Sequence, residues 1–132
     1  MYTILVADDD EDILGALGYV LKQKGYNVEQ AKDGAETIVK SRQLKPDLIL
    51  LDIMMPDLDG FITCRELKNK EETKRIPIIM LTARGEAEDI RTAFKAGAND
   101  YIVKPFIMEK VLGKIEKLLG PKAEREYKID FS

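Results

Sequence analysis

Short apolar runs alternate along the chain with longer segments in which apolar residues recur every three or four positions. Three of the runs, at 4–7, 48–51 and 78–81, contain only apolar residues and have the length of a strand. Continuous runs of this kind are typical of strands that are covered on both faces of a parallel sheet. Two weaker runs, at 28–31 and 101–103, predict two further strands.

The segments between the runs have the spacing of amphipathic helices. The first helix is predicted from the apolar positions Ile13, Leu14, Leu17, Val20 and Leu21. Gly25 is placed to end it, because glycine adopts the left-handed cap conformation at little cost. Further helices are predicted over 33–42, 61–67, 86–96 and 108–119. Five strands that alternate with five helices predict an α/β domain, with a parallel sheet and helices on both of its faces.

The composition is that of one globular domain. The chain has 132 residues, of which 45% are hydrophobic and 34% charged, and this length is typical of a single domain. The formal net charge of −3 argues against direct nucleic-acid binding by this domain. No apolar stretch reaches the roughly 20 residues of a membrane span, and the start lacks the features of a signal peptide. We therefore expect a soluble, cytoplasmic protein that does not contact a membrane.

Missing residue types exclude several kinds of catalytic site. The chain contains no histidine and one cysteine, Cys64. Ser-His-Asp triads, Cys-His pairs and histidine-ligated zinc are therefore excluded within this chain, as is an intramolecular disulfide. Cys64 falls on the apolar face of its predicted helix, so we interpret it as a small core residue.

Polar residues follow four of the predicted strands at their carboxyl ends. Asp8 and Asp9 come after the first strand, and Asp52 comes after the third. Thr82 and Lys104 follow the fourth and the fifth. Because ligands of parallel sheets bind beyond this edge, we expect these side chains to converge. Mg²⁺ prefers oxygen ligands and would offset the repulsion among the carboxylates, so the cluster favours a phosphate-handling site with an aspartate nucleophile.

Neighbouring acidic residues have a structural interpretation. Residues 10–12 are expected to lie at a helix N-terminus, where carboxylates interact favourably with the helix dipole. Asp57 and Asp59 are expected to form a turn, with Gly60 permitting the backbone to turn.

Motifs at these strand ends resemble those of the receiver domains of two-component response regulators. They are Ile4-Leu5-Val6-Ala7-Asp8-Asp9, the run from Asp47 to Pro56, Asp59-Gly60, Leu81-Thr82-Ala83, and Gly97-Ala98-Asn99-Asp100-Tyr101 leading to Lys104-Pro105-Phe106. The resemblance covers about residues 2–119. It implies the flavodoxin-like (CheY-like) doubly wound fold, in which a five-stranded parallel sheet has the order 2-1-3-4-5.

The same resemblance implies a receiver domain over 1–120, followed by a tail over 121–132. The tail is charged, with Tyr127, Ile129 and Phe131 alternating against polar residues. The sequence leaves open whether the tail is an extra strand, a partner-binding arm or the start of a linker to an effector domain outside this chain.

The resemblance also implies roles for the clustered residues. Asp52 would be the phosphoacceptor, taking a phosphoryl group from the phosphohistidine of a sensor histidine kinase. Mg²⁺ would be held directly by Asp9 and Asp52, by Asp8 mainly through water, and by the backbone carbonyl of Met54.

Two further residues are implied to interact with the phosphoryl group. Lys104 would contact it, and Thr82 would move towards it. Tyr101 would then swing inward and alter the surface of the last two helices and the strand between them. This population shift would control an effector domain or a downstream protein.

Two finer expectations concern lifetime and assembly. Met54 and Arg84 stand two positions after Asp52 and Thr82, and we expect them to flank the path of attacking water and to lengthen the life of the phosphorylated form. The motifs also resemble receivers of winged-helix transcription regulators, so a homodimer through the same surface is one expected assembly. The segment 109–115 lacks the arginine usual in that subfamily, which counts against pairing driven by phosphorylation.

The alternative is a Mg²⁺-dependent phosphatase or phosphotransferase of the haloacid-dehalogenase type. Such enzymes place a second acid two positions after the nucleophile, where this chain has Met54. A nucleotide-binding module is disfavoured because the chain has neither G-x-G-x-x-G nor G-x-x-x-x-G-K-[ST]. We therefore predict a signalling switch that catalyses only its own phosphorylation and dephosphorylation.

Overall fold

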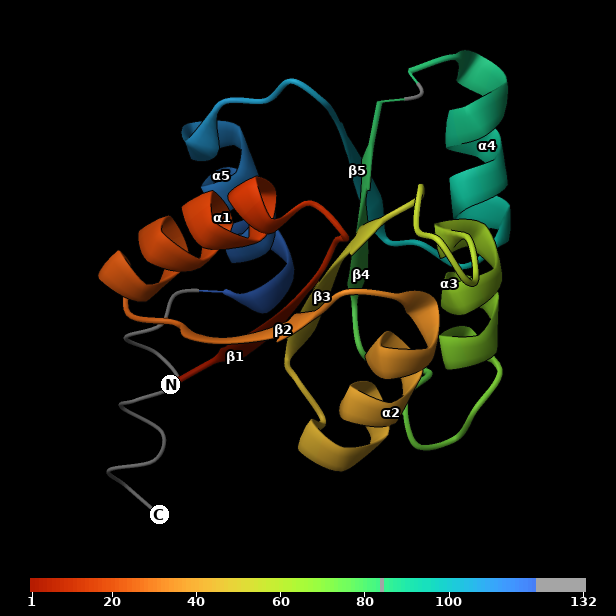
Figure 1. Cartoon of the computed structure of the whole chain (residues 1–132), viewed down its shortest axis with the longest axis horizontal. Helices are drawn as coiled ribbons and strands as arrows, with labels where there is room; N and C mark the ends of the chain where they lie inside the picture. The colour runs from red at the N-terminus through yellow and green to blue at the C-terminus, as the bar shows by residue number, and fades with distance from the viewer. Residues whose placement is uncertain (84, 121–132) are drawn as a thin grey trace.

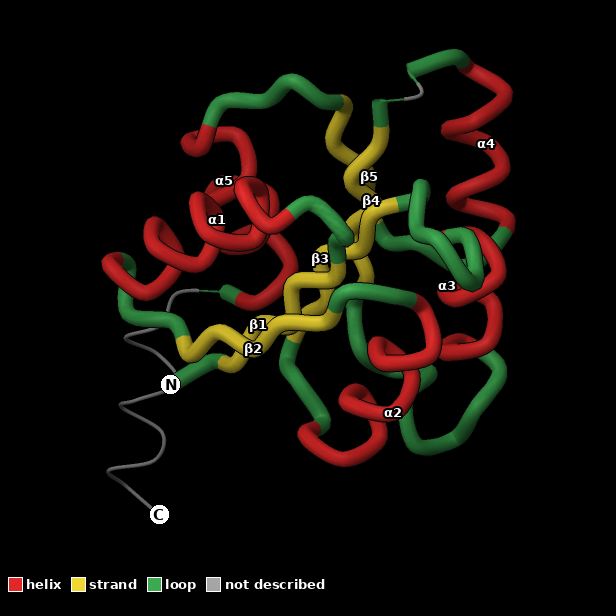
Figure 2. The backbone as a smooth tube through the Cα atoms, in the orientation of Figure 1, coloured by secondary structure: helices red, strands yellow, loops and turns green. Residues whose placement is uncertain are grey.

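The computed structural model describes residues 1–83 and 85–120, in which a parallel sheet lies between two layers of helices (Figures 1 and 2). The strands are β1 (Thr3–Ala7), β2 (Asn27–Ala31), β3 (Leu48–Asp52), β4 (Ile78–Thr82) and β5 (Asp100–Val103). The helices are α1 (Glu11–Gln23), α2 (Gly34–Leu44), α3 (Gly60–Lys68), α4 (Ala87–Lys95) and α5 (Met108–Leu119). The sheet order is β2-β1-β3-β4-β5, and every pair is parallel. The predicted strands, helices and strand order are confirmed.

Two apolar clusters, one on each face of the sheet, form the core. Helices α1 and α5 cover one face, and α2, α3 and α4 cover the other (Figure 1). All residues of β3 and β4 are buried. Successive side chains of a strand point to opposite faces, so Leu50 joins the α1–α5 cluster while Leu51 joins the other. Each such side chain contributes roughly 1.5–3 kcal/mol by leaving water.

The ends of the helices follow the sequence closely. Asp10 caps α1 by accepting the amide of Asp12 at 2.9 Å, and Asp33 caps α2 by accepting that of Glu36 at 2.7 Å. Gly25 follows α1 with a φ of 91°, the left-handed conformation expected of it.

Gly60 departs from expectation. We expected it to let the backbone turn, but it begins α3 without a left-handed φ. A Cβ there would lie 2.5 Å from the carbonyl oxygen of Asp52 and 2.6 Å from Cα of Ile53. The position needs glycine because the helix start packs directly on the backbone that leaves β3.

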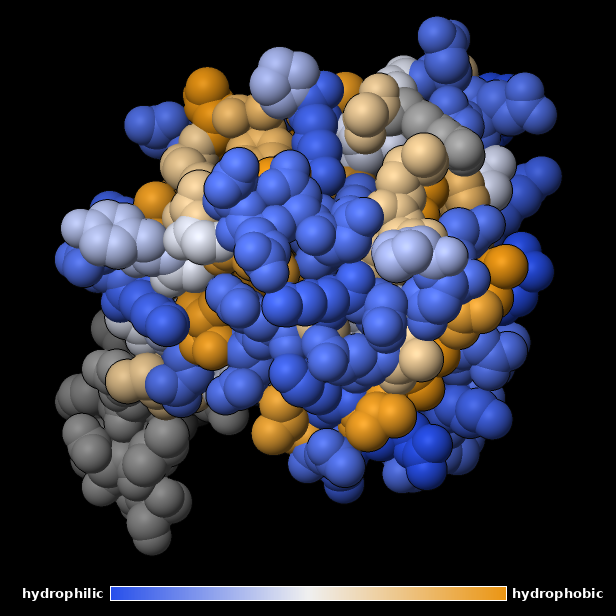
Figure 3. All heavy atoms as spheres, viewed as in Figure 1, coloured by the Kyte–Doolittle hydropathy of each residue, from blue (hydrophilic) through white to orange (hydrophobic). Residues whose placement is uncertain are grey.

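The surface in Figure 3 is mostly hydrophilic, with apolar side chains gathered over α2 and α3. Among the residues that the structure describes, no helix has the length and apolar character needed to cross a membrane. Arg84 and the tail over 121–132 lie outside the described residues, so the expectations placed on them stay predictions.

Candidate functional site

Three carboxylates meet where β1 and β3 end. Asp8 and Asp9 follow β1, while Asp52 ends β3. The two strands pair side by side, with Ala7 opposite Leu51, so their carboxyl ends coincide. One oxygen from each carboxylate lies within 4.8 Å of the others. Asp8 and Asp52 are buried and Asp9 is exposed. The cluster therefore has two carboxylates shielded from water and one that solvent can reach.

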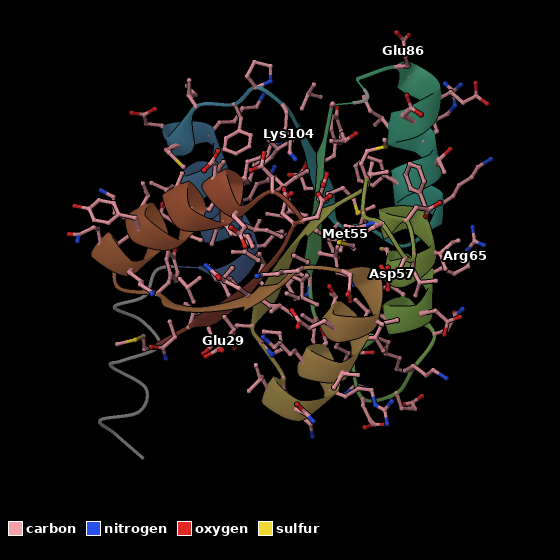
Figure 4. The ribbon with its side chains drawn as sticks, in the orientation of Figure 1. Glu29, Met55, Asp57, Arg65, Glu86 and Lys104 are labelled. Atoms are coloured by element: carbon pink, nitrogen blue, oxygen red, sulfur yellow. The ribbon has the colours of Figure 1, made fainter. Side chains whose placement is uncertain are left out.

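Lys104 brings the positive charge to this cluster (Figure 4). Its ammonium lies 3.0 Å from Oδ2 of Asp8 and 3.3 Å from Oδ1 of Asp52. The residue follows β5, and its amide donates to the carbonyl of Thr82 at 2.7 Å. The peptide bond between Lys104 and Pro105 is cis. The structure thus brings together the three aspartates and the lysine that the strand ends predicted.

The pocket holds more negative charge than Lys104 can offset. Burial, and after it the charge of Asp8, raise the pKa of Asp52 to about 6, even though Lys104 and the amide of Met54 act to lower it. Burial disfavours the ammonium of Lys104, but its hydrogen bond to Asp8 and the charges of Asp52 and Asp8 outweigh that effect and raise the pKa of Lys104. A second cation would therefore be stabilised beside Asp52.

The oxygens on offer suit Mg²⁺. Oδ1 of Asp8 accepts the amide of Asp10 at 3.0 Å, and Oδ2 accepts from Lys104, so Asp8 is largely occupied. Asp9 is exposed and Asp52 lies beside it, followed two residues later by the backbone of Met54. Carboxylate and carbonyl oxygens with room for water are what this hard cation requires.

Thr82 and Tyr101 lie on one face of the sheet. Tyr101 pairs with Met80, and Thr82 is two residues beyond Met80 on β4, so the alternation of side chains directs both to the side of α4. Thr82 is buried. The ring of Tyr101 is half-buried, meets Phe94 edge-on at 5.8 Å, and has the Lys114 ammonium 5.7 Å from its centre.

Of the two residues expected to flank the path of water, the structure describes Met54 and does not describe Arg84. Met54 lies beside the site, where the residue is 56% exposed. Its neighbour Met55 is buried in the core. Arg84 lies outside the residues that the structure describes.

Two aspartates of the loop after β3 do more than form a turn. Asp59 caps α3 by accepting the amide of Ile62 at 2.9 Å. Asp57 accepts the amides of Gly34 and Ala35, at 2.7 and 2.9 Å, and so joins the loop to the start of α2. Those hydrogen bonds hold the pKa of Asp57 below its usual value. The sequence offered no signal for this contact, because the two segments are 23 residues apart.

Other expectations are confirmed. Cys64 is fully buried in the core, where burial raises the pKa of its thiol to about 11. Asp10 caps α1, and Glu11 pairs with Lys32 at 3.1 Å at the surface. These residues have structural roles outside the pocket.

Comparisons with known proteins agree with this geometry. A family model described as the response regulator receiver domain matches residues 4–116. The DNA-binding dual master transcriptional regulator RpaA of Synechocystis is 44% identical over 119 residues, which cover 90% of this chain and 49% of that protein. The transcriptional regulatory protein ResD of Bacillus subtilis is 42% identical, covering 94% of this chain and 50% of ResD. The chain spans about half the length of these curated relatives.

Solved structures match over nearly their whole length. A putative response regulator from Chloroflexus aurantiacus shares 34% identity, with a TM-score of 0.86, over 91% of this chain and 98% of that one. The receiver domain of the sensor histidine kinase PA1611 of Pseudomonas aeruginosa shares 31% identity, with a TM-score of 0.84, over the same proportions. That receiver has a magnesium ion coordinated in its active-site cleft. The matches favour the receiver interpretation over the haloacid-dehalogenase alternative.

Proposed function

This chain belongs to the family of response regulator receiver domains, and we propose that phosphorylation of Asp52 is the event that switches it. Receiver domains of response regulators are signalling switches. The observation that carries the proposal is the position of Asp52, which lies beside Asp8 and Asp9 and 3.3 Å from Lys104.

Asp52 is the proposed nucleophile. An oxygen of its carboxylate attacks the phosphorus of a phosphohistidine on a sensor histidine kinase. The new O–P bond forms as the P–N bond breaks, and the electron pair of that bond returns to the imidazole nitrogen. Asp52 must be ionised for this step. The charge and the hydrogen bond of Lys104 favour that state, whereas burial and the charge of Asp8 oppose it.

Asp9, Asp52 and the carbonyl of Met54 are the proposed direct ligands of Mg²⁺, and Asp8 is a ligand through water. When bound, the ion neutralises charge on the phosphoryl oxygens. Lys104 holds a second positive charge over the same oxygens, since it already faces Asp52. The hydroxyl of Thr82 donates to one of them. The chain catalyses only its own phosphorylation and dephosphorylation. Met54, which is exposed, slows the approach of water to the phosphoryl group, and the same role is proposed for Arg84.

The output surface is proposed to be α4, β5 and α5. Movement of Thr82 opens space for Tyr101, which then changes that surface. Relatives of this chain are named as transcription regulators, so we propose a transcriptional output, reached through an effector domain or a downstream protein.

The same surface is the proposed contact of a homodimer. On this surface Lys114 forms an ion pair with Asp100 of the same chain at 2.9 Å, so its charge is less available to a second copy. Light scattering with and without beryllofluoride tests whether the homodimer forms.

The proposed donor is a kinase that acts in the cytoplasm, and the receiver is therefore proposed to be in the same compartment.

Incubation with acetyl phosphate and Mg²⁺, followed by intact-mass measurement, tests the central proposal. We expect one phosphate on the wild type, and none on Asp52→Ala or after chelation of the metal. Asp12→Ala is the matched control, because this carboxylate is exposed in the first turn of α1. An Asp52→Ala protein that still takes up one phosphate would contradict the assignment.

A further inference from the structure

The loop between β3 and α3 carries the backbone of Met54, and both of its ends are bonded to the core of the domain. The amide of Ile53 donates to the carbonyl of Leu81 at 3.2 Å. The amide of Gly60 donates back to the carbonyl of Ile53 at 2.7 Å. Residues 54–59, between these two hydrogen-bonded ends, form a short loop at the edge of the sheet.

Asp57 joins the middle of this loop to the start of α2. Its Oδ1 accepts from the amide of Gly34 and its Oδ2 from that of Ala35, at 2.7 and 2.9 Å. Figure 4 shows Asp57 between the start of α2 and α3. The first amides of a helix have no partner within it and carry partial positive charge. Asp33 serves the next amide of α2, that of Glu36, so the first two depend on Asp57.

Gly34 allows the close fit that this contact needs. A Cβ at that position would lie 2.6 Å from Oγ1 of Thr63 and 2.7 Å from Cβ of Leu58. The start of α2, the loop and α3 therefore pack with no room for a side chain between them. The close packing at Gly34 and the hydrogen bonds of the Asp57 carboxylate to the α2 amides both hold the loop in place.

We propose that Asp57 is a positioning residue for the metal site, which it serves by holding the loop that presents the carbonyl of Met54 beside Asp52. The inference rests on the proposed function, in which that carbonyl is a metal ligand. A backbone carbonyl has no rotamers with which to adjust, so its position depends on the loop. Fixing the loop in advance removes the entropy cost of ordering it when the cation binds.

Asp47 provides a matched control. Its Oδ2 accepts the amide of Thr3 at 2.8 Å, so it too joins a loop carboxylate to the backbone of a distant element. Thr3 begins β1 and Asp47 precedes β3, which places this contact at the opposite end of the strands from the pocket. Asp47→Ala removes this carboxylate–amide hydrogen bond, where Asp57→Ala removes two of the same kind, and it does so without touching the loop of Met54.

The test is a titration of metal-free protein with MgCl₂, followed by amide chemical shifts, for the wild type, Asp57→Ala, Asp57→Asn and Asp47→Ala. Hydrogen exchange of the Gly34 and Ala35 amides in the metal-free proteins shows whether the contact is lost. We expect Asp57→Ala to weaken Mg²⁺ affinity about tenfold, as loss of a supporting contact around a metal ligand does. Asp57→Asn should fall between it and the wild type, and Asp47→Ala should retain wild-type affinity.

Wild-type affinity in Asp57→Ala, with the two amides exchanging freely, would overturn the inference. Equal weakening in Asp47→Ala would also overturn it, because the effect would then follow from stability alone. If Asp57→Ala does not fold, Asp57→Asn decides between the same two outcomes. A wild type whose shifts ignore Mg²⁺ would instead overturn the proposed function, and this inference with it.

Discussion

The ammonium of Lys104 donates to Asp8 across 3.0 Å, joining residues 96 positions apart in the sequence. The side chain of Asp8 is 1% exposed and that of Lys104 is 19% exposed, so water screens the pair weakly. This ion pair connects the end of the first strand to the end of the last, and it sets the charge balance of the pocket.

Replacing Lys104 should destabilise the metal-free domain. Lys104→Ala leaves the buried carboxylates of Asp8 and Asp52 without their ammonium, and loss of one partner of a buried pair costs about 3 kcal/mol. Urea unfolding in chelator at pH 7 measures the loss. The control is Lys32→Ala, whose exposed pair with Glu11 should contribute at most about 1 kcal/mol. Equal losses in the two variants would contradict the expected role of burial.

Asp52→Asn should stabilise the metal-free domain at neutral pH. The folded pKa is raised to about 6 from an ordinary 3.8, so ionisation of Asp52 disfavours the fold. The contribution of Asp52 to stability is therefore complete below the ordinary pKa and is lost as pH rises through about 6. We expect the variant to be more stable by about 2 kcal/mol at pH 7. The measurement is urea unfolding from pH 4 to 8 in chelator, and an advantage that grows towards pH 4 would show the sign to be wrong.

Asp57 should have the opposite pH dependence. The amides of Ala35 and Gly34 lower its pKa in the folded protein, so its ionised form favours the fold. That contribution is complete above the ordinary carboxyl pKa and is lost as pH falls through the lower, folded value. The urea midpoints of wild type and Asp57→Asn should differ at pH 7 and converge in acid. Midpoints that stay equally far apart at every pH would contradict this expectation.

Gly60→Ala should be among the most damaging small substitutions. The added Cβ would lie 2.5 Å from a backbone oxygen of Asp52, and backbone cannot move aside as a flexible side chain does. We expect a loss of about 2 kcal/mol or more, with weaker Mg²⁺ binding because the strand end shifts.

Gly113→Ala is the matched control for that substitution. Nothing lies within 4 Å of a Cβ at Gly113, which is in the interior of α5. Alanine there should stabilise the domain by about 1 kcal/mol, since it favours helix more than glycine does. Thermal unfolding of both variants checks the pair, and a Gly60→Ala protein as stable as the wild type would refute the packing argument.

The sequence by itself determined the elements and the edge at which the site forms. The apolar runs of β3 and β4 are continuous because both faces of these strands are buried. The run of β2 is weaker because this strand lies at the edge of the sheet, with Asn27, Glu29 and Gln30 exposed. Once the strands are parallel, the residues that follow them must share one edge, so Asp8, Asp52 and Lys104 were predictable without coordinates.

Only the tertiary structure decided which groups touch. Asp8 and Asp9 are adjacent in the sequence, yet the first is buried against Lys104 and the second is exposed. The contact of Asp57 with Gly34 and the approach of Gly60 to Asp52 depend on how α2, α3 and the loop settle against the sheet. Periodicity indicates which face of an element is buried. Close contacts between distant segments arise from packing, which local sequence does not encode.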